Sequence, residues 1–136
     1  MTRKKELSPL IEPTKSELEI LQILWKYGPS TVRLVNDKLN EAKREVNYAS
    51  TLKLMQIMHD KGLLSRDQTQ MKHVYAAAQE ESTTKDFLLE KFIDNLYEGS
   101  ASSMMMQLMG NSKTTLKELE SIRALIDQFG KIKTKK

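Results

Sequence analysis

The chain has 136 residues, of which 39% are hydrophobic and 29% are charged, with only 5 Gly and 3 Pro. This composition is typical of a soluble, helix-rich protein and excludes a disordered chain and a β-sandwich. The net charge of +4 is compatible with a nucleic-acid partner but does not establish one. Because the chain contains no Cys, disulfides, thiolate metal sites and cysteine nucleophiles are excluded.

The apolar runs are far shorter than the roughly 18 residues that span a bilayer. Residues 1–13 lack the apolar segment of a secretion signal. We therefore expect a cytoplasmic protein with no membrane partner. Because residues 1–13 mix basic side chains with two prolines, we expect them to form a flexible arm, and residues 131–136 should form a basic tail.

A first helix is predicted directly after the arm. Thr14 and Glu17 have the spacing of a capping box, and apolar residues at helical spacing follow as far as Trp25. The helix should end just before Gly28, because Gly28 supplies a left-handed turn and Pro29 cannot continue a helix. We interpret Trp25 as a core anchor.

A second, shorter helix should start at the cap Ser30–Thr31 and run to about Ala42. The linker 43–45 then leads into Val46–Leu64, where a third helix is capped by Asn47 and closed by Gly62. This order of helices is that of a helix-turn-helix unit.

The third helix is expected to have two distinct faces. The face turned toward the core comprises Tyr48, Thr51, Leu52, Leu54, Met55 and Met58. The outward face comprises Ala49, Ser50, Lys53, Gln56, Ile57 and Asp60. A solvated helix normally carries charge pairs four residues apart, whereas a helix in the DNA major groove needs small polar side chains near its start. We therefore interpret this helix as a recognition helix.

Behind it, the short half-apolar runs Leu63–Asp67 and His73–Ala77 flank a polar segment, a pattern typical of a β-hairpin. A hairpin directly after a recognition helix is the wing of a winged helix. We predict a winged helix-turn-helix DNA-binding domain over residues 14–80.

From Ser82 onward the pattern predicts three helices that end at Gly99, near Gly110 and at Gly130. Short amphipathic helices of this kind cannot bury their apolar stripes alone, and a second copy is the simplest partner. The predicted fold is therefore mainly α with a small β-hairpin, and residues 81–130 form a helical homodimerisation domain. The expected interface residues are Phe87, Phe92, Leu96, Met105, Met109, Leu119, Ile122, Leu125 and Ile126.

The DNA interpretation assigns contacts by side-chain chemistry. Lysine pairs with guanine, hydroxyls with either base type, and an alanine methyl with the thymine methyl. Base contacts are expected from Asn47, Ala49, Ser50 and Lys53. Phosphate-backbone contacts are expected from Thr31, Lys43, Arg44, Tyr48, Arg66, Gln70, Lys72 and His73. For the wing residues a solvated hairpin tip is the alternative.

Enzymatic and metal chemistry find little support in the residues. His59 and His73 are the only histidines and lie on different predicted elements, with no metal-binding or general-base motif around them. We expect no catalysis, no metal and no cofactor. Thioethers suit Cu(I), but we interpret the Met104–Met109 cluster as adaptable packing at a core or interface.

The pattern from Thr14 to Phe129 resembles the penicillinase-repressor family of winged-helix transcriptional repressors. The most specific part runs from Asn47 to Tyr75: a tyrosine and hydroxyl residues that open the third helix, KGLL that closes it, and a wing that ends in Val-Tyr. Ser16–Val35, with its Trp and its Gly-Pro break, is similar to the first two helices of the family.

The resemblance implies a homodimer that binds a two-fold DNA operator and represses an operon for β-lactam resistance, metal handling or another stress. The copper branch senses metal through a C-terminal cysteine cluster, which this chain lacks. In the β-lactam branch a sensor-activated protease cuts an Asn-Phe pair, and Gln107 and Leu108 stand at the matching positions here. Because Gln-Leu departs from Asn-Phe, the sequence leaves release by proteolysis open but does not support it. The alternative functions are a protein-interaction module and a metal-responsive repressor.

Overall fold

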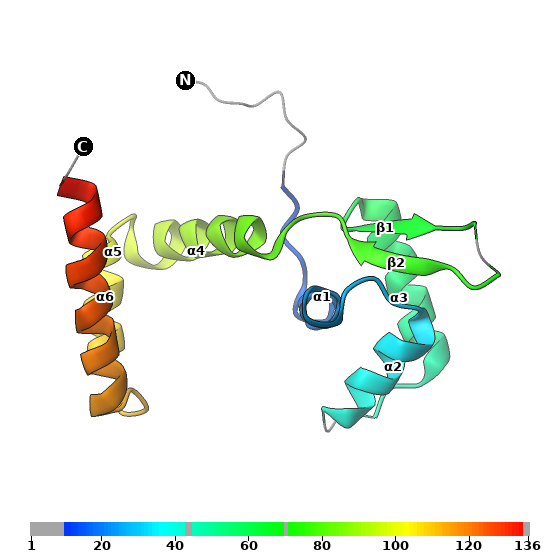
Figure 1. The fold of residues 1–136 in the computed structure, drawn as a ribbon, viewed down its shortest axis with the longest axis horizontal. Coiled ribbons are helices and arrows are strands. Elements are labelled where there is room, and N and C mark those ends of the chain that lie inside the picture. The colour runs from blue at the N-terminus through cyan, green and yellow to red at the C-terminus, as the bar shows by residue number, and fades with distance from the viewer. Residues whose placement is uncertain (1–9, 43–44, 70, 135–136) are drawn as a thin grey trace, which may run out of the picture. The chain divides into compact units, whose positions relative to one another are not determined.

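The computed structural model describes residues 10–42, 45–69 and 71–134. Within these ranges the chain forms six helices and one two-stranded antiparallel sheet (Figure 1), which confirms the predicted fold class. Contacts divide the chain into one unit that ends at Leu88 and another that begins at Leu89. Most of the predicted arm and the end of the predicted tail lie outside the described residues, as do Lys43, Arg44 and Gln70.

The first unit contains three helices followed by a hairpin, as a winged helix requires. Its elements are α1 (Lys15–Tyr27), α2 (Val32–Glu41), α3 (Tyr48–Lys61), β1 (Leu64–Asp67) and β2 (Val74–Ala77). The strands pair antiparallel, with Leu64 opposite Ala77 and Asp67 opposite Val74. Ser30 adds a short third segment to this sheet, since its backbone N–H and C=O both bond to Tyr75, at 2.9 and 2.8 Å.

The helix boundaries of the first unit follow from local capping chemistry. Thr14 and Glu17 form the predicted capping box, in which each side chain accepts the other residue's backbone N–H at 3.2 and 2.9 Å. Asn47 and Gly62 cap the two ends of α3, and Gly62 is left-handed at φ 90° and ψ 7°. Gly28 differs from the prediction, because its ψ of −173° takes the positive-φ backbone out of the left-handed helical region and into an extended path.

The core of the first unit lies between the three helices and the hairpin. Its fully buried side chains are Ile20, Val35, Thr51, Met55, Met58 and Tyr75. Trp25 packs against this core, half-buried, and its indole Nε1 donates to the backbone oxygen of Gln79 at 3.0 Å. The side chain therefore anchors α1 to the segment that follows the hairpin.

The second unit contains the end of α4 (Glu81–Tyr97), then α5 (Ala101–Met109) and α6 (Leu116–Thr134). The predicted end of α6 at Gly130 is wrong, because the helix continues through this glycine. A glycine inside a helix costs only about 1 kcal/mol relative to alanine, and the residues around Gly130 are helix-compatible. Gly130 also has no positive φ that would turn the chain away.

No described side chain after Thr84 is buried in the single chain. The large apolar residues of the second unit that are exposed include Leu96, Met106, Leu116, Leu125, Phe129 and Ile132. Amphipathic helices normally bury such a stripe against a neighbour. Within the described ranges, none of the helices combines the length and apolar character that crossing a bilayer requires.

Candidate nucleic-acid interface

The start of α3 presents small polar side chains and one ammonium to solvent. Asn47, Ala49, Ser50 and Lys53 are all exposed. The Asn47 side-chain oxygen accepts the Ser50 N–H at 2.7 Å, which leaves the Asn47 amide nitrogen as a donor toward solvent. No described carboxylate forms an ion pair with Lys53. The four residues predicted to face base edges thus share one accessible surface.

Tyr48 departs from the predicted division of α3 into two faces. It was placed on the core face, but it is 39% exposed. It stands in the first turn of the helix, where its ring lies under the Arg33 guanidinium of α2, with Cζ 4.6 Å from the ring centroid. The outward face otherwise agrees with the prediction, since Gln56, Ile57 and Asp60 are also exposed.

A buried amide on α2 fixes the position of α3. Asn36 is 4% exposed, and its Nδ2 donates to the Val46 carbonyl and to the Thr51 hydroxyl, both at 2.9 Å. Asn40 continues the network, since its side-chain oxygen accepts the Val46 N–H at 2.7 Å. Asn36 is not among the predicted site residues, although its helical spacing from Val32 and Leu39 puts it on the apolar face of α2.

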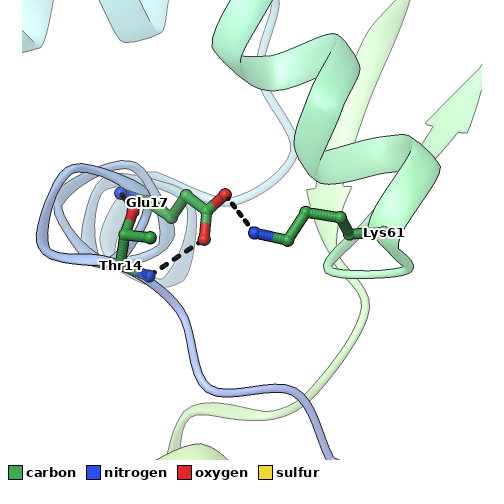
Figure 2. A network of polar contacts seen from close by, with 3 residues as sticks. All are labelled: Thr14, Glu17 and Lys61. Carbon is green, nitrogen blue, oxygen red and sulfur yellow. Dashed lines mark hydrogen bonds and ion pairs between the residues drawn. The ribbon is translucent and has the colours of Figure 1, made fainter.

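A second polar link holds the other end of α3 (Figure 2). The Lys61 ammonium donates to Glu17 at 2.7 Å, while the second oxygen of this carboxylate accepts the Thr14 backbone N–H. Burial raises the pKa of the Glu17 carboxyl, but the hydrogen bonds from Lys61 and Thr14 and the charge of Lys61 outweigh it. The pKa of Glu17 is therefore held below its ordinary value. The end of α3 is thereby tied to the start of α1.

Four of the predicted backbone-contact residues line one open groove of about 410 Å³ between α2, α3 and the hairpin. They are Thr31, Tyr48, Lys72 and His73, and Arg33, which was not predicted, also lines the groove. No Asp or Glu is among the described residues that line the groove. The groove therefore presents cationic and hydrogen-bonding groups without a competing carboxylate.

Arg66 behaves differently from the other predicted wing contacts. Its Nη1 donates to the Tyr75 hydroxyl at 3.5 Å, and its guanidinium lies 5.9 Å from the centre of that ring. With the Gln68 amide turned so that its oxygen faces the arginine, Gln68 accepts from Nε and Nη2 at 2.8 and 2.7 Å. Arg66 is thus engaged within the hairpin itself.

The remaining candidates are spread over the second half of the chain. Of the predicted interface residues, Phe92, Leu96, Met109, Leu125 and Ile126 are exposed. Phe87, Met105, Leu119 and Ile122 are half-buried. Gln107 and Leu108 lie exposed within α5. Among the described residues, no group of three His, Cys, Asp or Glu side chains is placed to hold a metal ion.

Three helices with a hairpin, an outward-facing α3 and a cationic groove beside it define the class of winged-helix DNA-binding proteins. The chain matches the family model described as penicillinase repressor over residues 13–128, so it belongs to this family of DNA-binding transcriptional repressors. It is 20% identical over 121 residues to the penicillinase repressor of Staphylococcus aureus, an alignment that covers 89% of this chain and 95% of the relative. The predicted family membership is confirmed.

Proposed function

We propose that this protein represses transcription in the cytoplasm as a homodimer that binds a two-fold symmetric operator in double-stranded DNA. The observation that supports the dimer is the apolar surface of the second unit, from which Leu96, Leu116, Leu125 and Phe129 protrude between 49% and 72% exposed. Apolar surface of this extent is typical of an interface. A two-fold dimer presents two recognition helices about one turn of DNA apart.

In this proposal each α3 enters a major groove and reads bases with Asn47, Ala49, Ser50 and Lys53. Thr31, Lys72 and His73 contact the phosphate backbone from the adjoining groove, which Tyr48 also lines. Arg66 takes part only if the DNA displaces its contacts within the hairpin. A two-fold symmetric DNA site follows from the symmetry of the dimer, since the first unit of each protomer, its DNA-binding head, reads one half-site.

For the regulated genes, the relative's name suggests an operon of the β-lactam-resistance type, and another stress operon is the alternative. For release, we propose cleavage by a sensor-activated protease at Gln107–Leu108, because both residues are exposed. The bond lies inside α5, so cleavage requires that this helix first unwind locally. The protein can be incubated with lysates from host cells grown with and without a β-lactam. The measurement is whether a fragment that ends at Gln107 forms.

The function is tested by selecting DNA fragments from the host genome with the purified protein and titrating the selected site with salt. Affinity should fall steeply as salt rises, because each phosphate contact releases a condensed counterion. A selected site without two-fold symmetry would contradict the dimeric operator. Failure to bind any duplex would favour a protein-interaction module, and tightly bound metal in the purified protein would favour a metal-responsive repressor.

Lys53→Ala tests the assignment of base contacts. If Lys53 reads a base, the variant should bind the operator about 1–3 kcal/mol more weakly while its affinity for random duplex changes little. Parallel titrations of both duplexes measure this difference. An equal loss for both would make Lys53 a phosphate contact instead. Lys15→Ala, which removes an exposed lysine at the start of α1, is the matched control.

A further inference from the structure

We propose that Arg33 binds a phosphate of the DNA backbone and that Tyr48 is a positioning residue that holds the Arg33 guanidinium in place for it. The proposal rests on the DNA-binding function proposed above and adds a residue and a division of roles to it. It starts from the contact between the two side chains, with the Arg33 Cζ 4.6 Å from the centre of the Tyr48 ring.

The position of Arg33 on its helix needs an explanation. Arg33 stands in the first turn of α2, immediately after Val32, and the partial positive charge of a helix N-terminus disfavours a cation there. Acidic residues are absent from the first turn of α2 and also from that of α3. Two helix N-termini and an arginine therefore combine positive charge, and neither first turn contains an acidic residue.

No described carboxylate forms an ion pair with the Arg33 guanidinium, although Asp37 lies one turn further along α2. The groove that it lines also contains Lys72, His73 and the hydroxyl-bearing Thr31, and none of its described lining residues is acidic. An anion from outside the chain would complete this arrangement.

A phosphodiester group fits this site better than other anions because of where the groove lies. Tyr48, Leu52 and Gln56 of α3 form one wall of it, so the groove follows the helix that would enter the DNA major groove. A phosphate backbone borders the major groove on either side, and arginine donates to phosphate through two parallel N–H groups. Free inorganic phosphate offers the same chemistry, and the test separates the two.

The stacked ring gives Tyr48 a role that needs no contact with DNA. An exposed arginine samples many rotamers, and ordering its side chain on binding costs up to about 2 kcal/mol of conformational entropy. A ring face under the guanidinium restricts these rotamers before binding, through cation–π attraction and stacking. The aromatic ring is then the part of Tyr48 that matters, and its hydroxyl is dispensable.

The test measures how DNA affinity depends on salt for the wild type, Arg33→Gln, Tyr48→Phe, Tyr48→Leu and the double variant Arg33→Gln/Tyr48→Leu. Losing one phosphate contact in each head of a dimer should lower the slope of log affinity against log salt by about 1.8. Arg33→Gln should show this loss equally on operator and random duplex. Tyr48→Phe should bind DNA like the wild type. Tyr48→Leu should weaken DNA binding when Arg33 is present, but should weaken it little further when Arg33 is already replaced by Gln.

Lys26→Gln is the matched control, since Lys26 also lies over a tyrosine ring, that of Tyr27, but does not line the groove. Its slope should stay that of the wild type, and thermal unfolding of each variant excludes loss of fold as the cause. An unchanged slope for Arg33→Gln, in a wild type that binds DNA, would overturn the inference alone. A wild type that binds no duplex would overturn the proposed function with it.

Two further outcomes are decisive. A loss of slope in Tyr48→Phe would make the tyrosine hydroxyl the phosphate ligand and remove the positioning role. The second outcome concerns inorganic phosphate, added at millimolar concentration and constant ionic strength to compete with DNA. If this competition requires Arg33 while Arg33→Gln leaves the salt slope of DNA binding unchanged, the site binds free phosphate. This result would overturn the backbone contact.

Discussion

Glu17 is a single carboxylate that serves two purposes in the first unit. It closes the capping box of α1 with Thr14, and it pairs at 2.7 Å with Lys61 at the end of α3. The Glu17 side chain is only 3% exposed, whereas that of Lys61 is 37% exposed, so solvent weakens the pair from one side. The hydrogen bonds from both partners stabilise the ionised form of Glu17.

We expect Glu17→Gln to lower the free energy of unfolding by about 1–2 kcal/mol at pH 7. Because the pKa of Glu17 in the folded protein lies below its ordinary value of 4.5, this contribution is present above about that pH and is lost as the pH falls through the folded value. Denaturant unfolding at pH 7 and in steps below pH 4.5 measures the difference between wild type and variant, which should shrink with acid.

The control is Glu81→Gln, which removes a similar ion pair, with Lys85, between two exposed side chains. Its effect should stay within about 0.5 kcal/mol of zero. A difference for Glu17→Gln that is the same at every pH would contradict the role of its charge.

At the level of residues, the sequence predicted what depends on neighbouring positions. The Thr14–Glu17 capping box is a matter of three-residue spacing, and so is the Asn47 cap of α3. The Lys61 partner of Glu17 is 44 positions away along the chain, and no local pattern indicates it. The exposure of Tyr48 was missed for the same reason, since its ring is held by Arg33 on another helix.

At the level of elements, the orientation of α3 depends on the amide of Asn36. Asn36→Ala would leave the Thr51 hydroxyl and the Val46 carbonyl without their 2.9 Å partner in the interior. We expect a loss of about 1–3 kcal/mol in the free energy of unfolding. At temperatures where the variant is folded, operator affinity should fall more than affinity for random DNA, because base contacts need an accurately placed helix.

Denaturant unfolding and DNA titrations measure the two effects of Asn36→Ala. Asp37→Ala, at the neighbouring exposed position of α2, is the control and should change stability by no more than about 0.5 kcal/mol. Equal losses of affinity on both kinds of DNA would show that the network stabilises the fold without placing the helix.

Substitutions of Gly130 and Gly62 distinguish a glycine inside a helix from one that ends a helix. An added Cβ at Gly130 has nothing within 4 Å, and the residue lies inside the helix, so Gly130→Ala should stabilise α6 by about 1 kcal/mol. Gly62 has φ 90°, so Gly62→Ala should destabilise the first unit by about 1–2 kcal/mol. Helical content and thermal unfolding measure both, and a destabilising Gly130→Ala would place the end of α6 at the glycine after all.

The elements were largely predictable because the residues that begin and end each one are its neighbours in the sequence. The caps of α1 and α3 and the closing Gly62 agree with the structure, and the hairpin falls where its two half-apolar runs stand. Gly28 ends α1 as predicted, but with an extended and not a left-handed helical backbone. Gly130 shows the limit of this reasoning, since a glycine can also continue a helix, as it does in α6. Nothing next to Gly130 in the sequence distinguishes the two cases.

For the whole molecule, the proposed homodimer requires that the apolar surface of the second unit form its interface. We expect Leu125→Glu, at a side chain 49% exposed in the single chain, to dissociate the dimer and lower operator affinity, because a monomer has only one head. Sedimentation measures the mass, and the unfolding of the first unit should be unchanged. Gln128→Glu adds the same charge at an exposed polar position of α6 and should remain dimeric.

A chain truncated after Leu88 provides the complementary test. It retains the buried Thr84 and the whole first unit, and it should fold as a monomer that binds DNA weakly. Undiminished operator affinity of this fragment would remove the argument for a dimer. The homodimer stays a prediction, made because the apolar stripes of α4 to α6 exceed what one short chain can cover.

The residues that anchor α3 from within, Asn36 and Thr51, are different from those it offers to solvent at Ala49, Ser50 and Lys53. If the outward residues read bases, as proposed, the residues that hold α3 in place and those that determine specificity are separate. A library randomised at the three outward positions should yield folded proteins throughout, among which new operator preferences can be selected. The DNA specificity of the first unit could then be changed without redesigning its contacts with the rest of the protein.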